Sequence, residues 1–309
     1  MDNFTDGRVG ELIKTISDLD GVPEGAFNIR VDGGCAAKHS TENVKIETKT
    51  DKPGINIIVK PGVENEVVYI PACITKSSVD DLVYNDFFIG KDAKVKIVAG
   101  CGVHVDGDEN SKHAGIHRFF VEEGAHVTYM EKHVGMGSGK GHALIDPETY
   151  CKVGKNAYLE MVTSQIGGVD RSIRNTTGKI NEGGALIIRE NLMTEGKEYT
   201  ETNFEVDMEG DNSGITLISR SVAKDESYQK YHSIINGNSA CTGHSACDAI
   251  IVGNAKVDAT PELKANHPDA MLIHEAAIGK IAGDQIVKLQ TLGMTEEEAE
   301  EKIIEGFLK

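Results

Sequence analysis

Three residues near the C-terminal end have side chains that bind soft metal ions or sulfur: Cys247, His274 and Glu275. Cys247 precedes the apolar run AIIVG, and the His-Glu pair follows a segment bounded by prolines. A thiolate binds iron or takes up sulfur, and imidazole and carboxylate are common additional ligands. A single cysteine beside a strand also serves as an ordinary core residue, and a His-Glu pair in a strand points to opposite faces. The residues alone leave both interpretations open.

A second group of candidate ligands has the spacing C-x2-H-x8-H-x3-H: Cys101, His104, His113 and His117. Thiolate and imidazole are ligands that zinc and iron prefer. The segment lacks a second cysteine, so it does not have the spacing of a zinc finger. The alternative is a polar loop at a corner of the fold.

Motifs of several enzyme classes are missing from the sequence. It contains no GxxxxGK[ST] loop, no GxSxG elbow and no HExxH pair. The glycine-rich segment VGMGSGKGHA (134–143) lacks the strand and helix that flank a phosphate loop, and we expect a flexible loop there. Neither ATP binding through a Walker motif nor a classical hydrolase or dinucleotide enzyme is indicated.

Composition and charge exclude some kinds of binding partner and indicate where in the cell the protein is located. The 309 residues carry a formal net charge of −17, which argues against binding to nucleic acid or to an anionic membrane. No stretch approaches the ~20 apolar residues of a membrane span. The first residues, MDNFTDGRVG, lack the apolar core of a secretory signal, so we expect a cytoplasmic protein. The six cysteines form no CxxC pair, and we expect free thiols.

Hydrophobic periodicity predicts strands over most of the chain. Apolar residues have helical spacing in 6–20, followed by Gly21, and alternate with polar residues from about 27 to 265. A sequence pattern of strand, glycine-containing turn and strand recurs at intervals of about thirty residues. Such a period indicates stacked strand units in a β-helix. An ordinary β-sandwich with similar turns is the alternative.

The last residues return to a helical pattern. Segment 284–293 ends on a glycine, and segment 295–308 begins with a capping box formed by Thr295 and Glu298. We expect two short helices in hairpin order, whose apolar stripe packs on the strands or binds a partner.

Two C-terminal segments, SACDAIIVG (245–253) and IHEAAIGKIAGDQIVKLQTLGMTEEEAEEKIIEGF (273–307), resemble the SufB/SufD family of iron–sulfur cluster assembly proteins. The resemblance continues more weakly upstream through HRFFVEEGAHVTYMEKH and RSVAKDESYQKYHSIING. It implies a mainly β fold: a right-handed parallel β-helix flanked by short N- and C-terminal helical segments. We therefore expect a helical segment over 1–26, a β-helix core over 27–265, and a helical segment over 266–309.

The resemblance also implies partners and cargo. The C-terminal segment of the family docks the ABC-type ATPase SufC, which accounts for the missing Walker motif. Two scaffold chains pair through the C-terminal end of the β-helix. A transient iron–sulfur cluster forms near that interface and passes to apo-proteins. Larger family complexes use a reduced flavin, for which this sequence offers no support.

The resemblance carries over to the site residue by residue. Cys247 aligns with the SufB cysteine proposed as a cluster ligand, and His274 and Glu275 align with the adjacent His-Glu pair. SufD-type chains generally lack that cysteine, so this chain resembles the SufB kind. The acidic residue that precedes the family's His-Glu pair is Ile273 here.

One departure concerns sulfur uptake. The cysteine through which the family takes up sulfur aligns close to His133, where no cysteine stands. Sulfur would then arrive as free sulfide or through one of three other thiols, Cys101, Cys151 or Cys241.

Four functions are compared. The leading one is a compact SufB-like scaffold that forms a homodimer in place of a SufB–SufD pair. The alternatives are a SufD-like structural subunit without a cluster, a β-helix carbohydrate enzyme, and a transporter permease. The permease is disfavoured by the lack of a membrane span, and the carbohydrate enzyme by a Cys/His candidate site and no secretory signal.

Overall fold

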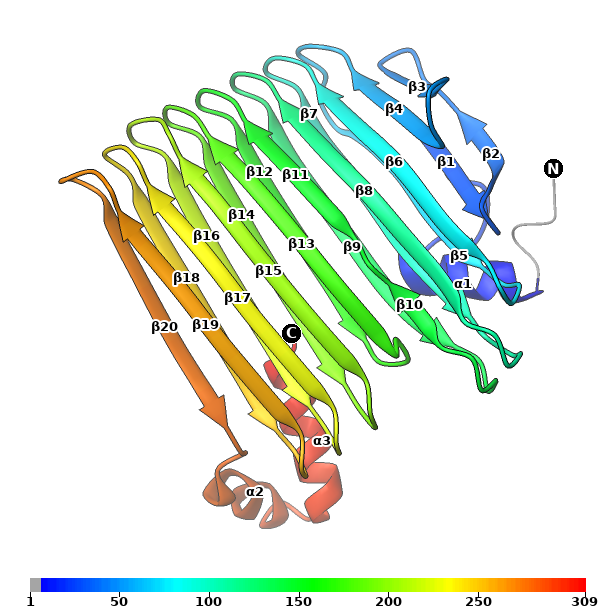
Figure 1. Cartoon of the computed structure of the whole chain (residues 1–309), viewed down its shortest axis with the longest axis vertical. Coiled ribbons are helices and arrows are strands. Elements are labelled where there is room, and N and C mark those ends of the chain that lie inside the picture. Colours follow the sequence, from blue (N-terminus) through cyan, green and yellow to red (C-terminus); the bar gives the residue numbers. More distant parts are fainter. Residues whose placement is uncertain (1–6) are drawn as a thin grey trace.

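The chain folds into a β-solenoid, and the computed structural model describes residues 7–309. Strands make up 57% of it, wound into about 8 turns, with short helices near both termini (Figure 1). The solenoid expected from the sequence repeat and from the family resemblance is confirmed. Residues 1–6, where the predicted N-terminal segment begins, lie outside the described residues.

Within residues 7–309 the strands form two ten-stranded sheets that enclose a narrow interior. The first sheet consists, in spatial order, of β2 (Gly34–His39), β1 (Ala26–Val31), β5 (Glu66–Ile74), β7 (Lys94–His104), β9 (His126–Met136), β12 (Tyr158–Ile166), β14 (Ala185–Thr194), β16 (Gly214–Ala223), β18 (Thr242–Ile251) and β20 (Met271–Gly279). The second consists of β19 (Lys256–Ala265), β17 (Tyr228–Gly237), β15 (Tyr199–Met208), β13 (Arg171–Ile180), β10 (Ala143–Ile145) with β11 (Glu148–Val153), β8 (Ser111–Val121), β6 (Asp80–Ile89), β4 (Gly54–Val59) and β3 (Val44–Thr48).

Strand pairing repeats with nearly constant register. Arg171 pairs with Tyr199, and Tyr199 pairs with Tyr228, so one turn takes 28 or 29 residues in this part of the solenoid. Because the paired strands are parallel and in register, equivalent side chains stack into rows that run along the solenoid axis. Each inward row forms one line of the core.

The corners between strands use residues that tolerate a left-handed backbone. Positive φ angles recur at one corner of successive turns, at Asp92, Gly124, Asn156, Gly183 and Asn212. Glycine adopts this conformation without strain, and Asn and Asp are the residues that adopt it next most readily.

Apolar rows fill most of the interior. Phe87 stacks on Phe119 with ring centroids 4.3 Å apart, and both are buried. Ile97, Leu159 and other fully buried aliphatic side chains continue the core in both directions. Each such side chain contributes about 1.5–3 kcal/mol through the apolar surface that it removes from water. Stacking successive turns is therefore what stabilises strands that would not fold alone.

The N-terminal end of the solenoid is covered. Helix α1 (Gly7–Ser17) packs against β5 and β7 through the buried side chains of Leu12, Ile13 and Ile16. Strands β2 and β3 run antiparallel to their neighbours β1 and β4, unlike the parallel strands of the later turns. The first turn is thus closed by short reversed strands and by the helix predicted from residues 6–20.

The C-terminal end carries two helices, α2 (Gly283–Gln290) and α3 (Glu296–Phe307), which contact each other. Thr295 caps α3, and the capping box with Glu298 predicted from the sequence is present. Strand β20 continues the solenoid to Gly279, so the strands extend past residue 265 into the segment expected to be helical. Most side chains of β20 are exposed, so its sequence does not need to alternate between apolar and polar residues. No helix in residues 7–309 is long and apolar enough to cross a membrane.

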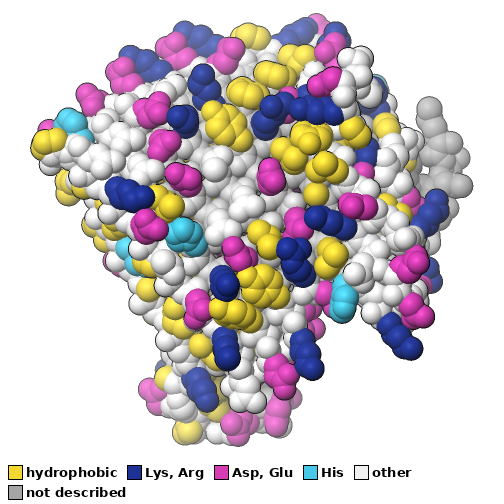
Figure 2. Space-filling view, viewed as in Figure 1, with side chains coloured by type: hydrophobic (Ala, Val, Ile, Leu, Met, Phe, Trp, Pro, Cys, Tyr) yellow, Lys and Arg dark blue, Asp and Glu magenta, His cyan; other side chains and the backbone are white. Residues whose placement is uncertain are grey.

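The surface is rich in charges of both signs. Figure 2 shows Lys and Arg side chains interspersed with Asp and Glu over the face that it presents. Several pairs join successive turns, such as Lys155 with Glu182 and Lys94 with Glu64. Exposed pairs of this kind contribute little stability each. They are consistent with strands stacked in register.

Candidate functional site

Cys247 lies in β18 with its side chain in the core. It is 1% exposed and stands in register with Ser219 of β16 and Ala276 of β20. Burial, with smaller contributions from Glu190 and Asp248, raises the pKa of the Cys247 thiol to about 12. The side chain is therefore a protonated thiol at neutral pH. A metal ion would have to displace that proton to bind the sulfur.

His274 lies on β20, on the same face of the sheet as Cys247. It is in register with Ser245, two residues before Cys247 on the neighbouring strand. Both ring nitrogens of His274 are shielded from solvent and have no hydrogen-bond partner in residues 7–309. Burial lowers the pKa of His274, so the ring is held neutral with one lone pair available. An unpartnered imidazole on the same inward face as a thiol offers donors of the kind that a thiophilic metal prefers.

Glu275 points to the other face. It is in register with Ala246, and its carboxylate lies 3.9 Å from Nε2 of His244 on the outer surface. The structure thus places Cys247 and His274 on one inward face of neighbouring strands, two residues apart in register, and Glu275 on the opposite face. The period of two in a strand gives this result. The residues present fit a soft metal or sulfur ligand with two donors, and the carboxylate would join only if the end of β20 rearranged.

The second group of candidates is also divided. Cys101, His113 and His117 line a cavity of about 230 Å³ at the N-terminal end of the interior. His104 lies outside it and contacts Asp106 at 2.9 Å. In residues 7–309 no three Cys, His, Asp or Glu side chains are arranged as a closed metal-binding set. The cavity therefore brings three of the four predicted residues to one space without forming a complete site.

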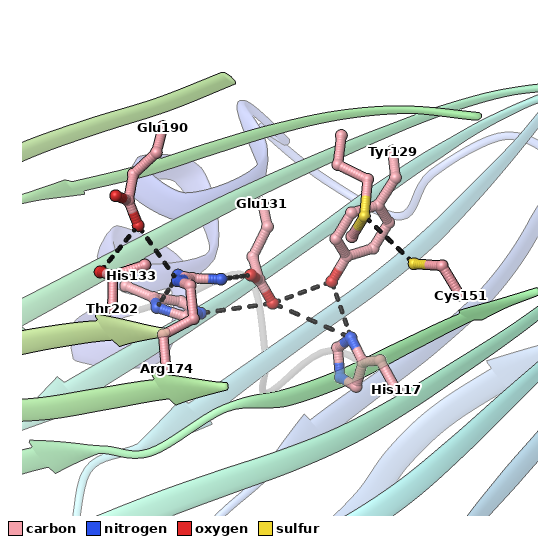
Figure 3. Close-up of polar contacts among 9 residues, drawn as sticks. His117, Tyr129, Glu131, His133, Cys151, Arg174, Glu190 and Thr202 are labelled. Atoms are coloured by element: carbon pink, nitrogen blue, oxygen red, sulfur yellow. Dashed lines mark hydrogen bonds and ion pairs between the residues drawn. The ribbon is translucent and has the colours of Figure 1, made fainter. Parts of the chain in front are cut away.

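A buried polar network that the sequence motifs did not indicate occupies the interior next to this cavity (Figure 3). Glu131 accepts hydrogen bonds from the hydroxyl of Tyr129 at 2.8 Å and from Nη1 of Arg174 at 2.8 Å. Nη2 of Arg174 lies 3.1 Å from Nδ1 of His133, and its Nε lies 3.6 Å from Glu190. All five side chains are buried. The arginine therefore links two carboxylates that lie two turns apart, on either side of Thr163.

The polar network extends along the solenoid towards Cys247. Glu190 accepts hydrogen bonds from Thr202 at 3.1 Å and from Ser219 at 2.9 Å. Ser219 is the register neighbour of Cys247. One inward row of the first sheet thus contains Glu131, Thr163, Glu190, Ser219 and Cys247 on consecutive strands. A polar row connects the neighbourhood of the cavity with the buried thiol.

Burial and pairing give the two glutamates of this network different acidities. Burial alone would raise the pKa of Glu131, but His133 and Arg174 outweigh it and hold that pKa well below its usual value. Burial raises the pKa of Glu190, because Arg174, Ser219 and Thr202 compensate only in part. Burial also raises the pKa of Cys101 well above its usual value. Glu131 is the ionised partner of Arg174, and the thiol of Cys101 is protonated.

Comparison with known proteins identifies the family. Residues 83–307 match the family model for the SufBD core domain of the SUF system of FeS cluster assembly. The chain belongs to the SufB/SufD family. The expectation from the C-terminal motifs is confirmed, and membership places the chain in iron–sulfur cluster assembly by the SUF system.

Curated SufB/SufD proteins match over most of the chain. A SufBD family protein from Methanothermobacter thermautotrophicus is 27% identical over 281 residues, which are 88% of this chain and 66% of the relative. One from Methanocaldococcus jannaschii is 24% identical, over 91% of this chain and 87% of the relative. SufB from Bacillus subtilis is 24% identical, over 72% of this chain and 47% of the relative. The chain thus spans about two thirds of the first relative and about half of the Bacillus protein.

Proposed function

We propose that this SufB/SufD protein is a scaffold on which a transient iron–sulfur cluster is built, with Cys247 and His274 as cluster ligands. The observation that carries the proposal is the pair of unpartnered ring nitrogens of His274 on the inner face that also holds Cys247. Iron and sulfide are substrates here, and the cluster is cargo. Two ligands from one chain leave other coordination positions on the iron open, which suits a scaffold that must release its product to apo-proteins.

The missing ligands would come from a second scaffold chain. Strand β20, which carries His274, is the last strand of its sheet, and β19 is the last of the other. Met271 and Ile273 of β20 are exposed apolar side chains. Pairing of two chains through these end strands would bury those side chains and place two sets of ligands at one interface. We propose a homodimer, with a SufD-like partner as the alternative.

A SufC-like ABC-type ATPase is the proposed partner of the C-terminal helices. Helix α2 has no fully buried residue, and Val287 and Leu292 are exposed apolar side chains at this end of the chain. Such a surface fits a protein partner better than solvent. The ATPase would supply ATP hydrolysis, and the scaffold itself would catalyse no reaction. A cytoplasmic location is part of the same proposal.

Cys101 is the proposed thiol for sulfur uptake. Cys151 is buried beside Met161 in the apolar core, and Cys241 is buried in the same core. Cys101 lines the cavity and is in register with His133, the position to which the family's sulfur-accepting cysteine aligns. Free sulfide is the alternative route. A donor persulfide would transfer its outer sulfur to the Cys101 thiol and leave as a thiol; mass spectrometry after incubation with such a donor would detect the Cys101 persulfide, and its absence would favour free sulfide.

The test of the scaffold is anaerobic reconstitution with ferrous iron and sulfide, followed by visible absorption and iron content. We expect Cys247→Ser and His274→Gln to lose most of the sulfide-to-iron absorption, and Cys241→Ser, a buried thiol in the same region, to keep it. Glu275→Gln tests whether the outward-facing carboxylate is a ligand, and retained absorption would show that it is not. Absorption unchanged in Cys247→Ser would contradict the proposed ligand.

A SufD-like structural role is the second candidate, and one observation favours it. The Cys247 thiol is packed among core side chains with a pKa of about 12, as in an inert core cysteine. In that case the chain binds the ATPase but holds no cluster. Failure of the wild-type chain to form a cluster, alone and with the ATPase, would favour this role.

A further inference from the structure

We infer that the cavity at the N-terminal end of the solenoid binds a divalent first-row transition-metal ion through Nε2 of His113 and Nε2 of His117. This site is separate from Cys247 and His274, which lie on the last strands of the first sheet. The two histidines project from β8 into the interior, two and six positions after Ser111 on the inward face. Both are buried, and both line the cavity.

The two ring nitrogens converge on one point. A Cβ at Gly115, which lies between the histidines on the same face, would be 2.8 Å from Nε2 of His117 and 3.5 Å from Nε2 of His113. Glycine leaves that point empty. That point is one carbon–carbon bond length from the Cα of Gly115, so an ion would lie beyond it in the cavity, where rotation of the two rings would bring both Nε2 atoms to the ~2.0–2.1 Å at which imidazole nitrogen binds such metals.

The opposite ring nitrogens are held by hydrogen bonds that fix the tautomer. Nδ1 of His113 donates to Oδ2 of Asp81 at 3.1 Å, so its Nε2 carries the lone pair. Nδ1 of His117 lies 2.7 Å from the hydroxyl of Tyr129, which itself donates to Glu131. That hydroxyl must therefore accept the Nδ1 proton, and the lone pair of His117 is also on Nε2. Carboxylate and tyrosine partners of this kind orient histidine ligands in metal sites.

The surroundings suit an open, exchangeable site. In residues 7–309, Nε2 of His113 has no hydrogen-bond partner, and Nε2 of His117 has one long contact, 3.4 Å from Nδ2 of Asn85. Within residues 7–309 no third Cys, His, Asp or Glu side chain completes a metal-binding group with them, so an ion held by the two histidines would take its remaining ligands from water or sulfur. Imidazole ligands favour iron, cobalt, nickel, copper and zinc over magnesium and calcium. If the proposed scaffold function holds, and only then, the ion in the cell would be ferrous iron awaiting assembly.

The test is an anaerobic titration of the full chain with Co²⁺ alone, followed by visible absorption and calorimetry. We expect one Co²⁺ per chain with the absorption of nitrogen ligation, and binding at least about tenfold weaker in His113→Gln and in His117→Gln. Gly115→Ala keeps both histidines but fills the point between them, and we expect the same loss. His104→Gln, on the same turn but outside the cavity, is the matched control and should bind as the wild type does.

Outcomes for the two sites are distinguishable. Cys247→Ser should bind Co²⁺ at this site normally even where it forms no cluster, so failure of the scaffold proposal leaves this inference standing. Equal Co²⁺ affinity in wild type and in the His113, His117 and Gly115 variants would overturn the inference, as would no binding by the folded wild type. Circular dichroism and urea unfolding of each variant show that a loss of binding is not a loss of fold.

Discussion

Arg174 offers the sharpest test of the buried polar network. It is 5% exposed, donates to Glu131 at 2.8 Å and lies 3.6 Å from Glu190. Arg174→Met keeps the length of the side chain but removes its charge. Two buried carboxylates then lose their shared cation. Breaking a buried ion pair in this way costs about 3–5 kcal/mol, and we expect the upper part of that range because one arginine serves two partners.

The assay is urea unfolding followed by circular dichroism, at neutral pH and at about pH 5.5. Without Arg174 the pKa values of Glu131 and Glu190 both rise, because burial raises them and the positive charge that opposed this effect is gone. The folded variant binds protons that the unfolded chain does not, so its free energy of unfolding recovers relative to wild type as the pH falls. The destabilisation should therefore be largest at neutral pH and smaller at the acidic value.

A surface arginine supplies the control. Arg171 lies three residues earlier, is about half exposed, and pairs with Asp146 at 3.1 Å. Arg171→Met should cost no more than about 1 kcal/mol at either pH. Equal stability of Arg174→Met and wild type at neutral pH would refute the reasoning. A large loss that does not depend on pH would also refute it, since the cause would then be packing and not charge.

Three further perturbations test other parts of the molecule. Ile16→Ala removes a fully buried side chain between α1 and the first turns; we expect a loss of about 2–5 kcal/mol in urea unfolding, and a loss below 1 would mean that α1 is not docked. Thr295→Ala removes the cap of α3 and should cost that helix about 1 kcal/mol, seen as faster amide exchange in its first turn and no change in the solenoid. Burial raises the pKa of Glu198 from 4.5 to about 7, so the folded chain holds a proton that the unfolded chain releases in that range. The stability of wild type relative to Glu198→Gln should therefore fall as the pH rises from 4.5 through about 7, and a difference independent of pH would contradict the assignment.

The repeat in the sequence indicated stacked strand units but left a β-sandwich open, and the family resemblance favoured the solenoid. Gly124 and Gly183 lie in turns of that repeat, and both adopt positive φ at a corner. The end of the solenoid was harder to predict. The side chains of β20 are mostly exposed on both faces, so only its pairing with β18 makes it a strand, and that pairing is not visible as local alternation.

The candidate sites were predicted in part, and strand phase explains the division. Cys101 and His104 are three residues apart in β7 and so face opposite ways, whereas His113 and His117 are four apart in β8 and share a face. The sequence did not predict the interior network, because charged residues in an alternating strand usually point outward. Glu131 follows Val127 and Tyr129 at intervals of two, and this shared phase with buried residues was the available signal.

The two ends of the solenoid differ in a way that limits how copies can join. The first end has the short strands β2 and β3, six and five residues long and reversed in direction, with Lys38 and Lys45 among them. Short, charged edge strands discourage further pairing. The other end offers β19 and β20, ten and nine residues long. A fibre forms only if each subunit can pair with another through both ends of the solenoid. If two chains associate through β19 and β20, as proposed, each would have no second end free for pairing, and the product would be a pair and not a longer polymer.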